Sequence, residues 1–187
     1  MSNFYIRRPE CVFIHVPKTG GSTIRRGLFG DLCVGPVFGE IPSEWEGLYK
    51  FGFVRHPFDR LVSAFEDFAQ KGGFKSSFLD FVDIAFDDTI SFNKNRRTLE
   101  ENIRHHCIPM SHPFNCLQFA DYIGRYENYS KDLQWVMEKL GFSLPHLPHL
   151  RKTIRKHWQY YFNKDVLLKC YGFYKEDFHK FNYKKPF

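Results

Sequence analysis

The chain has 187 residues and a formal net charge of +6, which is the size of one globular domain with a basic surface. Residues of the AVILMFWYC set make up 43% and charged residues 26%, so the composition excludes a disordered or fibrous chain. Aromatic residues reach 19%, with 22 phenylalanines, which predicts a core built from large flat side chains.

The charge and the cysteines narrow the classes of function and compartment. A sequence pI near 9.0 favours an anionic partner, such as nucleic acid, an acidic polymer or a phosphorylated small molecule. Five cysteines without a CxxC pair argue against a disulfide framework and for a reducing compartment. No stretch is typical of a signal peptide or a membrane span, so we expect a cytoplasmic chain. No repeat or linker divides the sequence, which predicts one domain over residues 1–187.

The first expected elements are a buried strand over residues 11–16 and a helix after the glycine turn that follows it. Ser22 or Thr23 can cap this helix, and Gly30 ends it. A second buried strand is expected over residues 49–54.

The second strand leads into a helix that begins at Pro57 and has an apolar stripe up to Gly72 and Gly73. Further expected elements are helices over residues 77–86, 130–140 and 164–181 and a strand over residues 121–126. Strands that alternate with amphipathic helices predict an α/β fold with a mainly parallel sheet.

The strongest chemical signal is the glycine turn between the first strand and its helix. Such a turn exposes backbone N–H groups at the positive end of a helix dipole, where an anion such as phosphate binds. Lys18 lies in the turn but precedes both glycines, whereas a Walker A loop places its lysine after the second glycine, so an ATPase is disfavoured. The alternative is an ordinary strand-to-helix turn with an exposed lysine.

Residues 16–23 (VPKTGGST) and 53–65 (FVRHPFDRLVSAF) together resemble the two cofactor motifs of sulfotransferases that use 3′-phosphoadenosine 5′-phosphosulfate (PAPS). The resemblance implies a P-loop-NTPase-like three-layer fold and a 3′-phosphate site formed by Arg55 and Ser63. It assigns the 5′-phosphosulfate loop to Lys18, Thr19, Gly20, Gly21, Ser22 and Thr23.

The resemblance extends to residues 121–128 (DYIGRYEN) and to the pattern of Tyr171, Asp177 and Phe178 near the end of the chain. These residues are similar to the carbohydrate sulfotransferase branch, which includes heparan and chondroitin enzymes, here in a short soluble form. The resemblance implies transfer of a sulfuryl group from PAPS to a hydroxyl, expected on a saccharide, with release of 3′-phosphoadenosine 5′-phosphate (PAP). It also places Tyr126 near the adenine.

Sulfuryl transfer needs an aligned nucleophile and a stabilised leaving group. Lys18 is expected to neutralise the bridging oxygen as PAP departs, and no metal is required because the sulfuryl group carries less negative charge than a terminal phosphoryl group. The family's His-x-x-Pro segment aligns on His106 as general base, with His105 second. The alternative is that both histidines are only polar loop residues. In that case the candidate bases are Asp80, Asp83 and Glu100.

Other features stay open. A zinc site from His105, His106, Cys107, His112 and Cys116 is disfavoured by the ligand spacing. Arg25 and Arg26 either face the cofactor or form a solvated pair. The basic run over residues 151–157 is either a solvated face or a surface for an acidic acceptor. A nucleic-acid-binding module lacks a recognisable motif, and a small-molecule kinase with a modified phosphate loop is the nearer alternative function.

Overall fold

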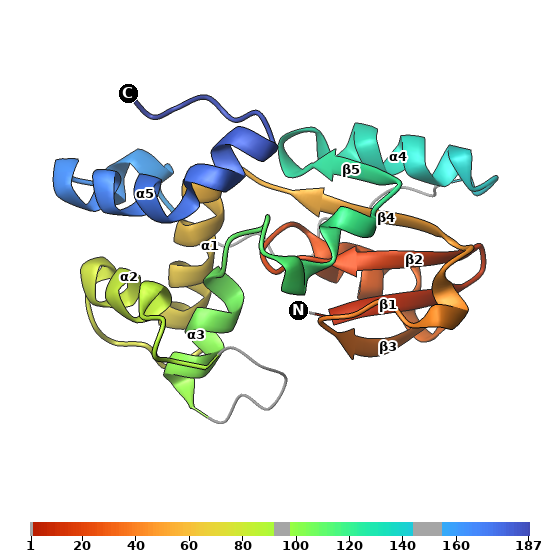
Figure 1. Cartoon of the computed structure of the whole chain (residues 1–187), viewed down its shortest axis with the longest axis horizontal. Coiled ribbons are helices and arrows are strands. Elements are labelled where there is room, and N and C mark those ends of the chain that lie inside the picture. Colours follow the sequence, from red (N-terminus) through yellow and green to blue (C-terminus); the bar gives the residue numbers. More distant parts are fainter. Residues whose placement is uncertain (1, 92–97, 144–154) are drawn as a thin grey trace. The chain divides into compact units, whose positions relative to one another are not determined.

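The computed structural model describes residues 2–91, 98–143 and 155–187. Two compact units divide the chain, and each is built from two separate stretches of sequence (Figure 1). The first unit comprises Met1–Arg55 and His112–Lys152, and the second comprises His56–Ser111 and Thr153–Phe187. No helix in the described part of the chain combines the length and the apolar character that crossing a bilayer requires.

The first unit contains a five-stranded mixed sheet in the order β3-β1-β2-β4-β5. Its strands are β1 (Ser2–Arg7), β2 (Glu10–His15), β3 (Cys33–Phe38), β4 (Tyr49–Val54) and β5 (Tyr122–Arg125). The expected α/β class is confirmed, as are the strands β2, β4 and β5 near their expected positions.

The expectation of a mainly parallel sheet is wrong, because the sheet is mixed. β2, β4 and β5 pair in parallel, but β1 pairs antiparallel with both β2 and β3. The reason is local: only Arg8 and Pro9 separate β1 from β2, and so short a connection can join only antiparallel strands. β3 lies at the sheet edge, where Pro36 needs no ladder hydrogen bond.

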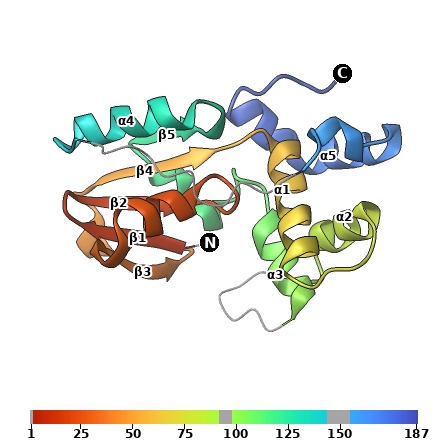
Figure 2. The ribbon, with the colours of Figure 1, turned by 180° about the vertical axis from the view of Figure 1, so that it is seen from behind.

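One face of this sheet is covered by the helix η1 (Thr23–Leu28) and by α4 (Tyr129–Lys139), as Figure 2 shows from behind. Alternate residues of the strands point toward these helices, because side chains in a strand alternate between the two faces. The resulting core comprises Phe4, Ile6, Cys11, Phe13, Ile24, Phe29, Phe51, Phe53, Tyr129, Leu133, Val136 and Met137.

The second unit is helical, with α1 (Pro57–Gln70), α2 (Phe78–Phe86), α3 (Leu99–Cys107) and α5 (Lys164–Lys180). Its core is aromatic, as the composition predicts: Phe58 stacks on Phe162 with ring centroids 4.7 Å apart, and Phe86 stacks on Phe173 at 3.8 Å. α1 begins at Pro57, as expected, and α2 and α3 each begin with a capping box. α3 was not expected from the hydrophobic pattern.

Short 3₁₀ turns connect these elements. They span Gly30–Leu32, Ser43–Trp45, Pro113–Asn115, Leu117–Phe119, Tyr126–Asn128 and Trp158–Tyr161. The first five belong to the first unit and the last to the second.

Candidate active site

The candidate site in the first unit is built on the carboxyl ends of three parallel strands. Lys18 follows β2, Arg55 follows β4 and Tyr126 follows β5. Parallel strands end at the same edge of a sheet, which is where ligands bind in open α/β folds. The sheet topology therefore brings together three residues that are far apart in the sequence.

Arg55 connects these three strand ends. Its Nη1 donates a hydrogen bond to the backbone oxygen of Lys18 at 2.9 Å, and its Cζ lies 4.1 Å from the centroid of the Tyr126 ring. A guanidinium at this distance over an aromatic face makes a favourable cation–π contact. Arg55 is 6% exposed, so its side chain is held by protein contacts.

The turn after β2 has a backbone conformation that few residues adopt. Lys18 has φ 68°, in the left-handed region, which costs free energy for any residue other than glycine. Two internal hydrogen bonds close the turn, from Thr19 Oγ1 to the oxygen of Val16 at 2.8 Å and from the Thr23 amide to the oxygen of Gly20 at 3.1 Å. Such strain is typical of functional sites, where the surrounding structure must hold the conformation.

The helix after the turn is a π-helix, a wider form than the α-helix expected. The amide of Phe29 bonds to the oxygen of Ile24 five residues earlier at 3.1 Å, and Gly30, with φ 45°, follows as expected. The prediction that Ser22 or Thr23 caps the helix is wrong, because Ser22 lies at the N-cap without a capping bond from its side chain and Thr23 is already the first helical residue.

Two rings lie directly against the glycine pair, and both were missed by the sequence analysis. A Cβ at Gly20, whose φ is 93°, would lie 2.6 Å from Cε2 of Tyr129, and a Cβ at Gly21 would lie 2.1 Å from Cδ2 of His15. The Tyr129 hydroxyl donates to the oxygen of Gly20 at 2.8 Å, and burial raises the pKa of this phenol, so it stays protonated. The glycine pair signals a close approach, but nothing local identifies Tyr129, 109 residues away, as the neighbour.

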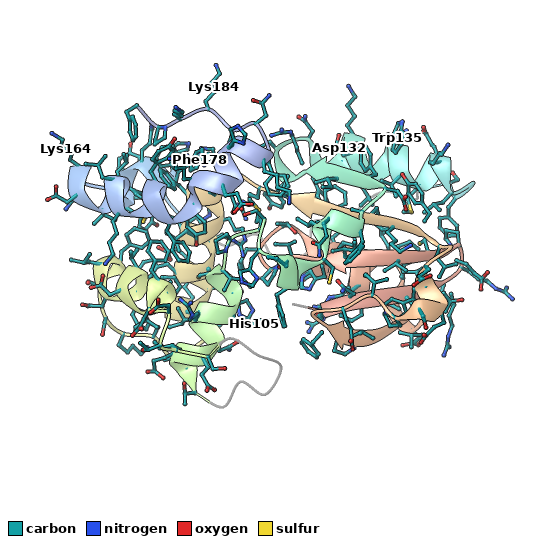
Figure 3. The ribbon with its side chains drawn as sticks, in the orientation of Figure 1. His105, Asp132, Trp135, Lys164, Phe178 and Lys184 are labelled. Carbon is teal, nitrogen blue, oxygen red and sulfur yellow. The ribbon has the colours of Figure 1, made fainter. Side chains whose placement is uncertain are left out.

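The remaining predicted site residues belong to the second unit. Ser63 lies on α1 and is 6% exposed. His105 and His106 lie in the last turn of α3 and not in a loop; His105, labelled in Figure 3, is 2% exposed, whereas His106 is half-buried. The structure thus brings residues 18–23, Arg55 and Tyr126 together in one unit and places Ser63 and both histidines in the other.

His106 has a defined hydrogen bond that fixes the form of its ring. Its Nδ1 lies 2.8 Å from the backbone oxygen of Asn102, and a carbonyl oxygen can only accept, so Nδ1 carries the proton. In the neutral ring Nε2 is then the basic nitrogen. The Phe68 ring packs edge-on against the imidazole, with ring centroids 5.3 Å apart.

Asp80, Asp83 and Arg25 have structural contacts of their own, whereas Glu100 and Arg26 are exposed. Asp80 caps α2 through Ser77, Asp83 is ion-paired with Lys169, and Glu100 is exposed. Arg26 is exposed as expected for a solvated residue, whereas Arg25 lies over the Phe4 ring with its Cζ 4.7 Å from the centroid.

Of the basic run over residues 151–157, positions 151–154 lie outside the described residues. Arg155 makes an ion pair with Asp59 at 2.7 Å, and Lys156 lies over the Tyr160 ring at 5.8 Å from its centroid. Within residues 2–91, 98–143 and 155–187, no group of three His, Cys, Asp or Glu residues is arranged to hold a metal ion.

The sequence model of the sulfotransferase family matches residues 40–184, more than half of the chain. The chain belongs to this family, and it is therefore a transferase of the class that moves sulfuryl groups. The matched region includes Arg55, Ser63, both histidines and Tyr126, whereas the turn at residues 18–23 precedes it. No curated protein and no solved structure matches the chain.

Proposed function

We propose that this sulfotransferase moves the sulfuryl group of PAPS to a hydroxyl of a carbohydrate acceptor and releases PAP. The observation that carries the proposal is the contact of Arg55 with the oxygen of Lys18 and with the Tyr126 ring. This contact draws together residues of both cofactor motifs at the strand ends, where cofactor phosphates bind in α/β folds. A P-loop-like three-layer arrangement of the whole chain is part of the same proposal.

Lys18 has the central role in the proposed cofactor site. PAPS supplies the activated sulfuryl group. The oxygen that bridges its sulfur and the 5′-phosphate becomes negatively charged as the bond between sulfur and this oxygen breaks. The Lys18 ammonium group neutralises that charge, and amides of the turn over residues 19–23 bind the 5′ end. Arg55 and Ser63 bind the 3′-phosphate, for which a guanidinium offers a fork of donors, and Tyr126 lies near the adenine.

His106 is the proposed general base. Its Nδ1–H bond to Asn102 leaves Nε2 as the nitrogen that takes the acceptor proton, and a half-buried ring is reachable by an acceptor. His105 is the second candidate, although its side chain is nearly inaccessible. His106→Ala should lower kcat by about 10²–10⁴ with little change in cofactor affinity, and His105→Ala is the matched control. Loss of activity only in His105→Ala would reassign the base.

The cofactor is tested by thermal unfolding with added nucleotide. A ligand that binds only the folded state raises its stability, so PAP should raise the unfolding temperature, while ATP with Mg²⁺ should not. Lys18→Ala, which lacks the proposed charge, should respond less to PAP. Stabilisation by ATP with Mg²⁺ alone would favour a small-molecule kinase instead.

The acceptor is tested with [³⁵S]PAPS and a panel of hydroxyl compounds. The panel holds a de-O-sulfated glycosaminoglycan, 4-nitrophenol and a tyrosine peptide, which represent saccharide, phenol and protein acceptors. Transfer to the glycosaminoglycan alone is the expected result. Transfer only to the phenol or the peptide would leave the sulfotransferase activity in place and refute the carbohydrate acceptor.

A further inference from the structure

The backbone that carries and follows His106 is held by buried polar side chains from two other helices of the second unit. Arg60 of α1 donates from Nη2 to the oxygen of His106 at 2.8 Å and from Nη1 to the oxygen of Ile108 at 3.0 Å. One guanidinium therefore binds both sides of the point where α3 ends at Cys107.

α5 holds the same segment with two further side chains. The Tyr174 hydroxyl donates to the oxygen of Cys107 at 2.6 Å. The Asp177 carboxylate accepts from the amides of Met110 at 2.8 Å and Ser111 at 2.7 Å. Arg60, Tyr174 and Asp177, called the clamp below, thus bind five backbone groups between positions 106 and 111.

The clamp is costly, which argues that it does more than fill the core. Arg60 is 1% exposed, and Tyr174 and Asp177 are 0% exposed. Burial raises the pKa of the Asp177 carboxyl, while the Arg60 charge acts in the opposite direction. Apolar side chains of similar volume often stabilise a core as well as buried charges do or better, whereas hydrogen bonds to five backbone groups fix one conformation.

That conformation determines the position of the imidazole. His106 and the segment after it move together, because Arg60 binds the oxygen of His106 itself. A displacement of this backbone would alter the 2.8 Å contact between Nδ1 and Asn102 that selects the tautomer. Other ring contacts of His106 come from Phe68 and His105, with ring centroids 5.3 and 5.7 Å away.

We propose that Arg60, Tyr174 and Asp177 are positioning residues that hold the backbone at positions 106–111 so that His106 keeps Nδ1 protonated and presents Nε2 as the base. The inference rests on the proposed function for its catalytic meaning. The tautomer and the orientation of His106 belong to the folded protein, so they can be measured without any acceptor.

The experiment compares two clamp variants with a matched core variant in the full chain. Tyr174→Phe removes one hydroxyl, and Asp177→Asn replaces one of two acceptor oxygens by a donor. Val166→Ala is the control, because Val166 is buried in the same helix and core but does not touch positions 106–111 through any of the five bonds. ¹⁵N spectra of labelled histidine, assigned with His106→Ala, report the tautomer and the pKa of His106. Thermal unfolding and [³⁵S]PAPS assays at several pH values accompany them.

The expected result is a His106 spectrum of the Nδ1–H form in the parent and in Val166→Ala, and a mixed or shifted spectrum in both clamp variants. kcat should fall about three- to tenfold in Tyr174→Phe and about tenfold or more in Asp177→Asn, with KM for PAPS unchanged. The pH at which the rate rises should shift in the clamp variants alone. If Asp177→Asn does not fold, Tyr174→Phe carries the test.

Parental tautomer, pKa and kcat in Tyr174→Phe would overturn the clamp and leave its residues as core residues only. A fall in kcat equal to that of Val166→Ala, at equal loss of unfolding temperature, would also overturn it. Full activity of His106→Ala is a different failure: it refutes the proposed base, and the imidazole spectrum then decides by itself whether the clamp positions the ring.

Discussion

Lys18 combines an unusual backbone with the charge proposed to stabilise the leaving group. Its φ of 68° is a backbone conformation that glycine adopts at lower cost than lysine does. Glycine, however, would not supply the amine. The turn is held by Arg55, which binds the backbone oxygen of Lys18, and by the bond from Thr19 to Val16. The conformation and the charge can therefore be separated by substitution.

Lys18→Ala should remove most turnover without unfolding the protein, because the charge matters most as the leaving group develops. Lys18→Gly is the matched control, since it relieves the left-handed strain and should raise the free energy of unfolding by about 1 kcal/mol while being equally inactive. Turnover with saturating PAPS and chemical denaturation measure the two effects. A parental rate in either variant would remove Lys18 from the phosphosulfate loop.

Arg55 and Ser63 are tested by their selectivity for the 3′-phosphate. Arg55→Ala should weaken PAP binding by about 2–4 kcal/mol, and Ser63→Ala by less, because charge-assisted bidentate contacts are stronger than single ones. Titration calorimetry with PAP and with adenosine 5′-phosphate, which lacks the 3′-phosphate, gives the comparison. Arg55 also contacts the turn, so some loss toward both ligands is expected. Equal losses toward the two ligands would show that neither residue reads the 3′-phosphate.

At the scale of elements, the contact between the turn after β2 and α4 depends on an absent Cβ. Gly20→Ala should lower the free energy of unfolding by about 2–4 kcal/mol, from the left-handed φ of 93° and the clash with Tyr129. Gly73→Ala separates the two causes, because Gly73 has φ 81° but open space around its Cβ position. It should cost about 1–2 kcal/mol. In a double-mutant cycle, Tyr129→Ala should recover part of the Gly20→Ala loss, and full additivity would contradict the contact.

The capping box of α2 makes the stability of the protein depend on acid pH. The Ser77 hydroxyl and amide bond to the Asp80 carboxylate at 2.7 and 2.9 Å, and these bonds lower the Asp80 pKa from its ordinary value of 3.8. A lowered folded-state pKa stabilises the fold above the unfolded-state value, and this contribution is lost as pH falls through the folded-state value.

Asp80→Asn should therefore unfold at a lower temperature than the parent at neutral pH, and the difference should shrink below about pH 4. Thermal unfolding from pH 2.5 to pH 7 measures it. Ser77→Ala removes the other half of the box and should abolish most of the effect of Asp80→Asn in the double variant. A difference that stays constant with pH would mean that the carboxylate charge does not act through the cap.

The elements that the sequence predicts well are those whose signal is local. β2 and β4 are short apolar runs, and α1 has both a proline start and a continuous stripe. β1 and β3 were not predicted, because these strands depend on their pairing partners more than on a local pattern. Apolar and polar residues alternate only weakly in β1. β3 contains Gly35 and Pro36, which are tolerated only because β3 is an edge strand.

The residues of the candidate site also differ in whether their signal is local in the sequence. Lys18, the glycine pair and Arg55 lie in contiguous motifs, so a resemblance found them. The clamp and Tyr129 act on backbone groups distant in the sequence, and only the fold brings them there. α3 lacked a clear apolar pattern, although Thr98 and Glu101 carry the capping-box spacing that marks its start.

At the scale of the whole molecule, the net charge of +6 bears on the acceptor. A basic protein attracts a polyanion over distances that added salt shortens, since the Debye length falls from about 10 Å at 0.1 M to about 3 Å at 1 M. A neutral acceptor gains nothing from this attraction. The salt dependence of KM therefore reports the charge of the acceptor that the surface favours.

With PAPS held at saturation, the apparent KM for an anionic de-O-sulfated glycosaminoglycan should rise at least about fivefold between 0.05 and 0.5 M NaCl, because many protein–polyanion contacts weaken together. The KM for a neutral alkyl glycoside is the control and should change by less than about twofold, since it has no charge for salt to screen. kcat should stay constant for both acceptors if salt acts on encounter and not on chemistry. An equal response of the two KM values would mean that the positive charge of the protein does not contribute to binding of the acceptor.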